Sequence, residues 1–483
     1  MNGKQNMYRV FCERAALQPH HPAIMGPGEN QLLSYAQLKA RIDEVAQRLR
    51  AQGVSPGQCV GLHFHSGVDY IVLTYALWAC GACVVPIAME LMPEEKYRVI
   101  HDIRMERILT TTQTEGLFSS RRMGQVVDID ANARLIPIQP EREHPEEFLA
   151  VNSAFLRFTS GTTNTSKGVV LSHETIFDRI HAANEVLKIG PDDSVVWLLS
   201  MSYHFTVSIV AYLSFGAGIV LCSNYFGKTI VEAASRHGAT LIYGSPVHFR
   251  MMAHETSGLP LHLRLAISTT TALTKEIEQA FYQRFGIPLS QAYGIIEIGL
   301  PCICTESQTS KPNSVGKLLP AFELRLLDSG NGENAHHIQV RGKGMLDAYY
   351  DPWKTRESIL MQDGWFDTGD LGYVDPDGYL FITGRSKDMI SVAGMKFFSQ
   401  EVEAVLEAHP DVKEACVFPA PQAQTGEVAH ARVVLNSGSL DERVTPDLIA
   451  HCAAHLASYK VPEQILLVSE LPRTASGKLI RRL

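Results

Sequence analysis

Residues Phe158–Gly168 have the sequence FTSGTTNTSKG, a segment rich in hydroxyl groups and glycine that lies between the apolar runs Ala154–Leu156 and Val169–Leu171. Glycine lets the backbone turn several N–H groups toward one point, and Ser and Thr hydroxyls add donors there. Lys167 adds a positive charge. The composition favours a phosphate-binding loop over an ordinary solvated turn. The loop is not a P-loop, because it contains no Gly-Lys pair followed by Ser or Thr.

The size and composition of the chain indicate a folded protein of several domains. Its 483 residues correspond to roughly two to four domains, and 45% apolar residues provide enough material for large cores. The formal net charge is −8, and no long block of Lys and Arg is present. This charge balance argues against nucleic acid as a partner.

Nine cysteines are scattered along the chain without a ligand set at zinc-like spacing. Cys80 and Cys83 form a C-x-x-C that leads directly into Val84 and Val85, which favours a buried strand over a redox or metal site. We therefore expect a reduced, cytoplasmic protein. The segment 195–222 contains no Asp, Glu, Lys or Arg, but Ser, Thr and Gly divide it into strand, loop, helix and strand. We expect a buried core element there and no membrane span.

Short apolar runs alternate with helical patterns in the first part of the chain. Ser34 and Gln37 form a capping box at the start of one helix, and Gly53 ends it. We expect further helices at Val68–Ala79, Thr175–Leu187, Ile230–Arg236 and Lys275–Phe285, and strands at Val60–Phe64, Cys83–Pro86, Val195–Leu199 and Thr240–Tyr243. Strands that alternate with helices imply parallel sheets covered by helices.

Beyond Gly316 the pattern changes to strands separated by Gly, Asp and Asn turns. Strands are expected at Glu323–Leu327, Ile338–Arg341 and Tyr379–Ile382, followed by helices at Gln400–Ala408 and Pro446–Leu456 and strands at Val412–Pro419, Ala429–Leu435 and Gln464–Val468. The charged stretch Arg385–Lys387 follows a glycine, and we place the domain boundary there.

Four more segments carry distinctive sequences downstream of the first loop. They are Gln291–Gly299 (QAYGIIEIG), Trp365–Gly372 (WFDTGDLG), Gly384–Lys396 (GRSKDMISVAGMK) and Pro472–Lys478 (PRTASGK). Together with the first loop, their content and order resemble the adenylate-forming ANL superfamily of acyl- and aryl-CoA synthetases, adenylation domains and luciferases. The resemblance covers essentially the whole chain and is greatest to an acyl- or aryl-CoA synthetase.

The resemblance implies an α/β fold with two domains. The large N-terminal domain, residues 1–385, would contain parallel-rich sheets covered by helices and a β-barrel-like subdomain. The small C-terminal domain, residues 386–483, would be α+β and mobile. Lys387 matches the family's hinge, where backbone rotation lets the small domain swing.

The reaction that the resemblance implies is the attack of a carboxylate on the α-phosphate of ATP, giving acyl-AMP and pyrophosphate. The nucleophile is already an anion, so the reaction needs cations and N–H donors around the phosphoryl oxygens and no general base. Transfer of the acyl group to a thiol would follow. The implied cofactors are ATP and Mg²⁺, and the implied acceptor is CoA or the phosphopantetheine of an acyl carrier protein.

The resemblance also assigns residues to nucleotide binding. Tyr293, followed by Gly294, resembles the aromatic residue that stacks on adenine, and Glu297 resembles the carboxylate that holds Mg²⁺. Asp370 would accept both ribose hydroxyls, and Arg385 would be the second ribose contact. The β- and γ-phosphates would be held by Thr159, Ser160, Gly161, Thr162, Thr163 and Lys167.

This chain departs from the family pattern at three positions. Asn164 and Ser166 replace a usual Gly and Pro in the phosphate loop, which is tolerable in a loop that is often mobile in the family. Ile296 stands where the family commonly has a Thr whose hydroxyl meets the α-phosphate. The loss of one such donor typically costs on the order of 10²-fold in rate.

Lys478 matches the family lysine that reaches from the small domain to bridge the carboxylate and the α-phosphate, and it is a predicted catalytic residue with Lys167 and His204. His204 resembles a gate beside the substrate carboxylate; its alternative is a satisfied core histidine. Gly394 and Lys396 would line the path of the thiol arm. The acid pocket would comprise Tyr203, His204, Val207, Ser268, Thr270, Ala292 and Ile295.

The run Met201–Val207 contains no acidic residue to pair with an α-ammonium group, so we expect a carboxylic acid without an α-amino group. The first hypothesis is an acid–CoA ligase. The second is an acyl-AMP ligase that loads an acyl carrier protein. The third is a nucleotide-binding paralogue with impaired catalysis, which Ile296 supports and Lys478 opposes.

Overall fold

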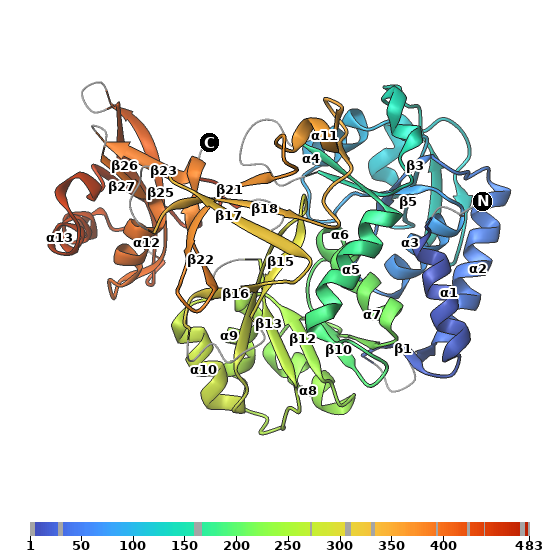
Figure 1. Cartoon of the computed structure of the whole chain (residues 1–483), viewed down its shortest axis with the longest axis horizontal. Coiled ribbons are helices and arrows are strands. Elements are labelled where there is room, and N and C mark those ends of the chain that lie inside the picture. Colours follow the sequence, from blue (N-terminus) through green and yellow to red (C-terminus); the bar gives the residue numbers. More distant parts are fainter. Residues whose placement is uncertain are drawn as a thin grey trace. The chain divides into compact units, whose positions relative to one another are not determined.

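The computed structural model describes residues 5–27, 32–158, 167–270, 273–304, 311–329, 334–392, 395–422, 426–438, 440–473 and 479–481. By its internal contacts the chain divides into two units (Figure 1). Unit 1 comprises Met1–Thr159, Lys167–Glu323 and Arg341–Phe366, and unit 2 comprises Ser160–Ser166, Leu324–Val340 and Asp367–Leu483. Each unit is described by itself below.

One sheet of unit 1 has the strand order β20-β19-β9-β8-β4-β3-β5-β7-β6. Its strands are β3 (Cys59–His63), β4 (Cys83–Pro86), β5 (Arg107–Thr111), β6 (Val127–Asp128), β7 (Ala133–Pro137), β8 (Ser153–Phe158), β9 (Gly168–Ser172), β19 (Ala348–Tyr349) and β20 (Lys354–Thr355). Strands β5, β3, β4 and β8 run parallel. Strand β8 then pairs antiparallel with β9, so the phosphate-loop segment joins two neighbouring strands.

The second sheet of unit 1 is parallel along β1, β11, β10, β12, β13 and β14. These strands are β1 (Pro22–Met25), β10 (Ser194–Trp197), β11 (Gly218–Leu221), β12 (Leu241–Gly244), β13 (Leu265–Ser268) and β14 (Leu289–Ile295). At its two ends, β2 (Leu32–Ser34) pairs with β1, and β15 (Gly299–Ile303) and β16 (Ser314–Leu318) follow β14. Helices α8 (Gly227–Arg236), α9 (Pro246–Ala253) and α10 (Lys275–Phe285) pack against one face through residues such as Val231, Phe249 and Phe281.

Further helices of unit 1 are α1 (Met7–Leu17), α2 (Tyr35–Ala51), α3 (Val68–Ala79), α4 (Pro93–Asp102), α5 (His173–Leu187), α6 (Met201–His204), α7 (Ile209–Phe215) and α11 (Arg356–Ile359). Helix α2 begins with the predicted capping box, in which Gln37 N–H donates to Ser34 Oγ at 3.2 Å and Ser34 N–H donates to Gln37 Oε1 at 2.8 Å. The charge-free segment 195–222 forms β10, α6, α7 and β11, as its Ser, Thr and Gly pattern predicts. None of the helices in the described part of the chain has the length and apolar character that a membrane span requires.

Unit 2 contains the strands that follow the change of pattern near Gly316. Strands β17 (Phe322–Leu327), β18 (His336–Gly342), β21 (Phe366–Val374) and β22 (Tyr379–Arg385) are neighbours in that order. The C-terminal sheet contains β23 (Met389–Val392), β24 (Met395–Phe398), β25 (Val412–Gln422), β26 (Gly426–Leu435) and β27 (Gln464–Leu467). Helices α12 (Ser399–Glu407) and α13 (Thr445–His455) cover this sheet through Val402, Leu406 and Leu448. The predicted α/β class is confirmed.

The start of α8 differs from the sequence-based expectation. Apolar periodicity places it at Ile230, whereas the helix begins at Gly227. A Cβ atom at Gly227 would lie 2.1 Å from the carbonyl oxygen of Met251, so only glycine fits where α8 approaches α9. A first turn without an apolar side chain leaves no periodic signal, and the prediction misses it.

The C-x-x-C motif is buried as expected. Cys80 is 4% exposed, and Cys83 is fully buried in β4. Burial raises the pKa of both thiols, which opposes formation of the reactive thiolate. Over the same described residues, no group of three or more His, Cys, Asp or Glu side chains is arranged to hold a metal ion.

His248 gives unit 1 a pH-sensitive helix cap. Its Nδ1 accepts the N–H of Ser245 at 3.1 Å at the start of α9. Burial lowers the pKa of this imidazole to about 4, compared with about 6.5 in an unfolded chain. As the pH falls below 6.5, the unfolded chain binds a proton that the folded chain does not. Stability is therefore lost between about pH 6.5 and pH 4.

We predict that His248→Gln weakens this pH dependence. Glutamine can accept the same N–H in a capping box but does not titrate. Between pH 7 and pH 5, the free energy of unfolding of the variant should fall by up to about 2 kcal/mol less than that of the wild type. Urea denaturation at the two pH values measures the difference. If the free energy of unfolding fell by the same amount between pH 7 and pH 5 in both proteins, the role of His248 would be contradicted.

Candidate active site

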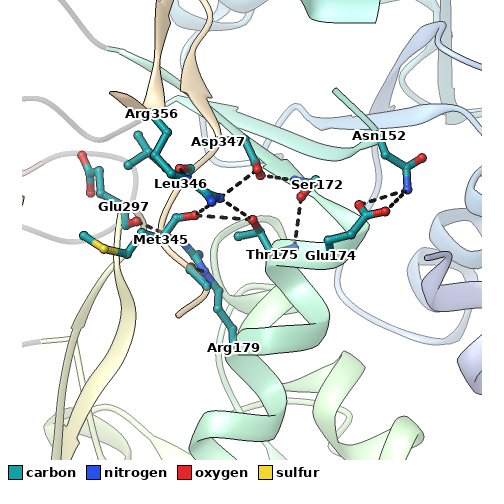
Figure 2. A network of polar contacts seen from close by, with 11 residues as sticks. Asn152, Ser172, Glu174, Thr175, Arg179, Glu297, Met345, Leu346, Asp347 and Arg356 are labelled. Carbon is teal, nitrogen blue, oxygen red and sulfur yellow. Dashed lines mark hydrogen bonds and ion pairs between the residues drawn. The ribbon is translucent and has the colours of Figure 1, made fainter. Parts of the chain in front are cut away.

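A buried guanidinium, that of Arg179 in α5, fixes the backbone on both sides of the candidate site (Figure 2). Its Nε–H donates to the carbonyl of Gly344, and its Nη2–H donates to the carbonyl of Glu297 at 3.1 Å. The N–H of Leu346 donates to the same Glu297 carbonyl at 2.7 Å. Arg179 is 3% exposed, and burial lowers its pKa to about 9. The segment that carries Glu297 is thus tied directly to a core helix.

Two glycines make room for Arg179. Gly344 has a φ of +74° and Gly299 a φ of +84°, both in the left-handed region that favours glycine. A Cβ atom at Gly344 would lie 2.7 Å from Arg179 Cγ, and one at Gly299 would lie 3.2 Å from the same atom. At Gly344 both the backbone conformation and the available space therefore require glycine. At Gly299 the conformation favours glycine and the space is tight.

A second arginine, Arg356, ties the approach to β19 to the start of α5 (Figure 2). Its Nη2–H groups donate to Thr175 Oγ1 at 3.0 Å and to Asp347 Oδ1 at 2.9 Å. The other oxygen of Asp347 accepts the N–H of Ser172 at 2.6 Å. These contacts fix the position of β19, which carries Tyr349.

Tyr349 brings together residues from two of the sequence motifs. The Lys167 ammonium lies 4.6 Å from the centre of the Tyr349 ring, and the Tyr349 hydroxyl donates to Glu297 Oε1 at 3.4 Å. Tyr349 is opposite Val169 in the β19–β9 pair, which accounts for its position beside Lys167. Burial raises the pKa of this phenol, so it is neutral at pH 7. The predicted phosphate-binding lysine and the predicted metal carboxylate thus contact one side chain.

Several predicted site residues cannot be placed. Thr159, Ser160, Gly161, Thr162, Thr163, Gly394 and Lys478 lie outside the described residues. Lys387 lies in the 3-10 helix Ser386–Asp388 and Lys396 lies in β24; their side chains lie outside the described part of the structure.

The hairpin of β14 and β15 carries the adenine-binding candidate Tyr293, which pairs with Cys302. The next residue, Gly294, allows a close approach, because a Cβ atom there would lie 2.2 Å from the carbonyl oxygen of Gly299. The strands are joined by a tight turn that contains Ile296 and Glu297. This turn directs Glu297 toward Tyr349.

The run Met201–Val207 contains both partly exposed and buried residues. Tyr203, His204 and Val207 are partly exposed, whereas the residues between and beside them, such as Phe205 and Thr206, are buried. Ala292 and Ile295 on β14 are also partly exposed. Thr270 adopts a φ of +79°, an unusual conformation for a β-branched residue that costs on the order of 1–3 kcal/mol.

Ser268 is placed differently from His204. The ring of His204 contacts that of Trp197 with a centroid distance of 6.4 Å. Trp197 is opposite Tyr243, and Tyr243 is opposite Ile267, the residue before Ser268. Because side chains alternate along a strand, Ser268 lies on the other face of the sheet from Trp197. The structure does not bring Ser268 and His204 together through this face.

In unit 2, the two predicted ribose contacts form an ion pair. Asp370 and Arg385 are opposite each other in the β21–β22 pair, and Arg385 Nε lies 2.8 Å from Asp370 Oδ1. Asp370 is 3% exposed, and its N–H donates to Thr368 Oγ1 at 3.1 Å. The arginine therefore lies against one oxygen of the carboxylate.

Arg157, the last residue but one of β8, was not among the predicted site residues. Its Nη1–H donates to the carbonyl of Tyr203, and its guanidinium carbon lies 5.5 Å from the centre of the Tyr203 ring. Burial lowers its pKa to about 10, while the neighbouring Tyr203 and Glu297 act in the opposite direction. A single arginine within the apolar strand that leads into the phosphate loop was the signal available in the sequence.

We predict that Arg179→Met destabilises the protein by about 1–3 kcal/mol, because the buried carbonyl of Gly344 loses its donor, while that of Glu297 keeps the N–H of Leu346. Urea denaturation measures the loss. The matched control is Arg443→Met, at an exposed arginine that pairs with nearby Asp441; it should stay within about 0.5 kcal/mol of the wild type. A loss below about 1 kcal/mol in Arg179→Met would contradict the structural role.

Comparison with known proteins gives matches along the whole chain. A family model described as AMP-binding enzyme matches residues 11–350, and one described as AMP-binding enzyme C-terminal domain matches residues 401–478. A sulfoacetate–CoA ligase from Cupriavidus necator is 28% identical over 98% of this chain and 96% of its own length. An oxalate–CoA ligase from Arabidopsis thaliana is 28% identical over 99% and 96%.

The fold matches a solved structure of o-succinylbenzoate CoA synthetase from Bacillus subtilis in complex with its acyl-adenylate intermediate. The TM-score is 0.85 at 26% identity, with 99% of this chain and 98% of that chain covered. A structure of the same enzyme with ATP and a magnesium ion gives a TM-score of 0.83 at 26% identity, with 99% of each chain covered. These matches confirm the resemblance drawn from the sequence motifs. The chain therefore belongs to the AMP-binding enzyme family, as one of its AMP-forming ligases.

Proposed function

We propose that this protein activates a carboxylic acid with ATP, releases pyrophosphate, and transfers the acyl group from acyl-AMP to the thiol of CoA. The observation that carries the proposal is that Tyr349 contacts both Lys167 and Glu297. A cation for the terminal phosphates and a carboxylate for their metal ion belong side by side in such a site. The CoA ligases among the relatives support the choice of acceptor.

The residues around Glu297 fit a magnesium ion bound together with a nucleotide. Mg²⁺ is usually held by one or two carboxylates plus substrate phosphates rather than by a cage of protein ligands. The Glu297 carboxylate contacts the neutral hydroxyl of Tyr349. The backbone carbonyl of Glu297 is held by Arg179 and by the N–H of Leu346. When bound, the ion would neutralise charge on the phosphate oxygens, and Glu297 would hold it in place.

Other residues receive proposed roles from the family motifs. Asp370 would accept the ribose hydroxyls, and Arg385, which forms an ion pair with it, would be the second ribose contact. Residues 386–483 would form the mobile small domain, with its hinge at Lys387. That domain would bring Lys478 to the phosphate under attack during adenylation.

The acid would lack an α-amino group. The run Met201–Val207 contains no carboxylate, and Arg157, which donates a hydrogen bond to the carbonyl of Tyr203, is a cation that would repel an ammonium group. The acids in the names of three of the relatives, sulfoacetate, oxalate and 2-succinylbenzoate, contain no amino group, and each carries two acidic groups.

The second candidate acceptor is the phosphopantetheine of an acyl carrier protein, which has the same thiol arm as CoA. The candidate from another class, a nucleotide-binding paralogue with impaired catalysis, has Ile296 in its favour. We also propose a reducing, cytoplasmic location. Cys59 and Cys83 are opposite each other on β3 and β4 and are both free thiols, which suits such a compartment.

The direct test is acid-dependent pyrophosphate release with ATP and Mg²⁺ over a panel of aliphatic, aromatic, dicarboxylic and α-amino acids. We expect release with one of the acids that lack an amino group, and a thioester when CoA is added. Thioester formed only on a carrier protein would favour the second candidate. ATP binding without release for any acid would favour the paralogue.

We predict that Lys478→Ala leaves ATP affinity nearly unchanged and slows acyl-AMP formation by at least ~10²-fold, the scale of losing one charge-stabilising group. Rapid-quench measurement of acyl-AMP and a separate nucleotide-binding titration distinguish the two effects. Lys413→Ala, at an exposed lysine of β25 in the same domain, is the matched control. A wild-type rate of acyl-AMP formation in Lys478→Ala would refute the role of Lys478.

A further inference from the structure

Arg157 presents more hydrogen-bond donors than its surroundings use. A guanidinium has five N–H donors. Among the described residues, one of these five donors has an acceptor: an Nη1–H of Arg157 donates to the carbonyl of Tyr203. The Nε–H of Arg157 is completely buried and has no acceptor among the residues that the structure describes. A buried donor without an acceptor costs about 1–3 kcal/mol, and more when it belongs to a charged group.

The charge of Arg157 is not neutralised by a direct partner. Within the described ranges, no carboxylate forms an ion pair with it. Glu297 is close enough to oppose the fall in its pKa, but Glu297 contacts Tyr349 and is the proposed ligand of Mg²⁺. The phenols near Arg157 are no substitute for an anion, because burial raises the pKa of Tyr203 to about 12 and also raises that of Tyr70.

Arg157 also lies where a substrate can reach it. Its Nε is buried, but the residue as a whole is partly exposed. Its guanidinium carbon lies 5.5 Å from the centre of the Tyr203 ring, and Tyr203, like His204 and Val207, is partly exposed. Strand β8 continues from Arg157 into the phosphate-loop segment. An acid held beside Tyr203 for attack on ATP would therefore lie within reach of a cation that lacks an anion.

On this basis we infer that Arg157 binds a second acidic group of the substrate, so that the acid is a dicarboxylate or a sulfocarboxylate. The inference rests on the proposed function, since it names the class of acid that the same site takes. A planar guanidinium matches a carboxylate or sulfonate oxygen pair through two parallel N–H donors. The second group stays ionised and unreacted while the first attacks the α-phosphate. Arg157 thus selects the acid and takes no part in bond formation.

The test uses acids matched in pairs that differ by one acidic group. Suitable pairs are glutarate with butanoate, and 2-succinylbenzoate with 4-oxo-4-phenylbutanoate. The quantity compared is the ratio of kcat/KM for the diacid to kcat/KM for its partner, from pyrophosphate release. In the wild type this ratio should exceed about 30 for at least one pair, the lower end of the effect of one partner in a buried charge pair.

Arg157→Gln should lower that ratio by at least about 30-fold, mainly through KM for the diacid, and Arg157→Lys should restore part of it. The midpoint of thermal unfolding provides a check on folding. It should not fall in Arg157→Gln, because the substitution removes a buried charge that has one hydrogen bond. Arg443→Gln, at an exposed arginine, is the matched control and should leave the ratio unchanged.

Three outcomes would overturn the inference. In the first, the wild type releases pyrophosphate with monoacids and not with their diacid partners. In the second, Arg157→Gln lowers kcat/KM equally for both members of a pair, which would place Arg157 at the reacting group. In the third, both Arg157 variants unfold at lower temperature and keep the wild-type ratio, which would make the residue purely structural. If no acid of any class supports release, the proposed function itself fails, and that result is distinct from these three.

Discussion

The candidate site depends on a constraint that lies beneath it, the burial of the Arg179 guanidinium between two backbone segments. One N–H group holds the carbonyl of Gly344, and another holds the carbonyl of Glu297. These two bonds satisfy Nε and Nη2, whereas the buried Nη1 has no acceptor among the described residues. Both segments are fixed by the same side chain. The position of the Glu297 carboxylate is thus a consequence of core structure, although Glu297 itself lies in a turn.

Tyr349 and Arg157 contribute to the candidate site in different ways. Arg356 and Asp347 hold the approach to β19 against α5, and Tyr349 on that strand separates Lys167 from Glu297. A neutral phenol thus contacts both the ammonium of Lys167 and the carboxylate of Glu297. Arg157, by contrast, is kept available because the protein supplies no acid for it.

Sequence motifs predicted the family, the α/β class and most elements because these depend on local patterns. The helix Val68–Ala79 and the strand Cys83–Pro86 are found with the predicted bounds. Predictions were weaker where the deciding contact is distant in the chain. The glycine at the start of α8 is required by the backbone of Met251, and the importance of Arg157 depends on Tyr203, 46 residues away. Tyr349 belongs to none of the quoted motifs, and its role is apparent only from its neighbours.

The dependence of Arg179 on Gly299 and Gly344 has an evolutionary consequence. Residues 179, 299 and 344 are far apart in the sequence but compete for the same space in the fold. The effect of changing any one of them therefore depends on the other two. A smaller residue at 179 would relieve the side-chain contacts at 299 and 344 at the loss of two donors, but the left-handed backbone would still favour glycine at both positions. A side chain at either glycine would displace the arginine, so homologues that keep the arginine are expected to keep both glycines.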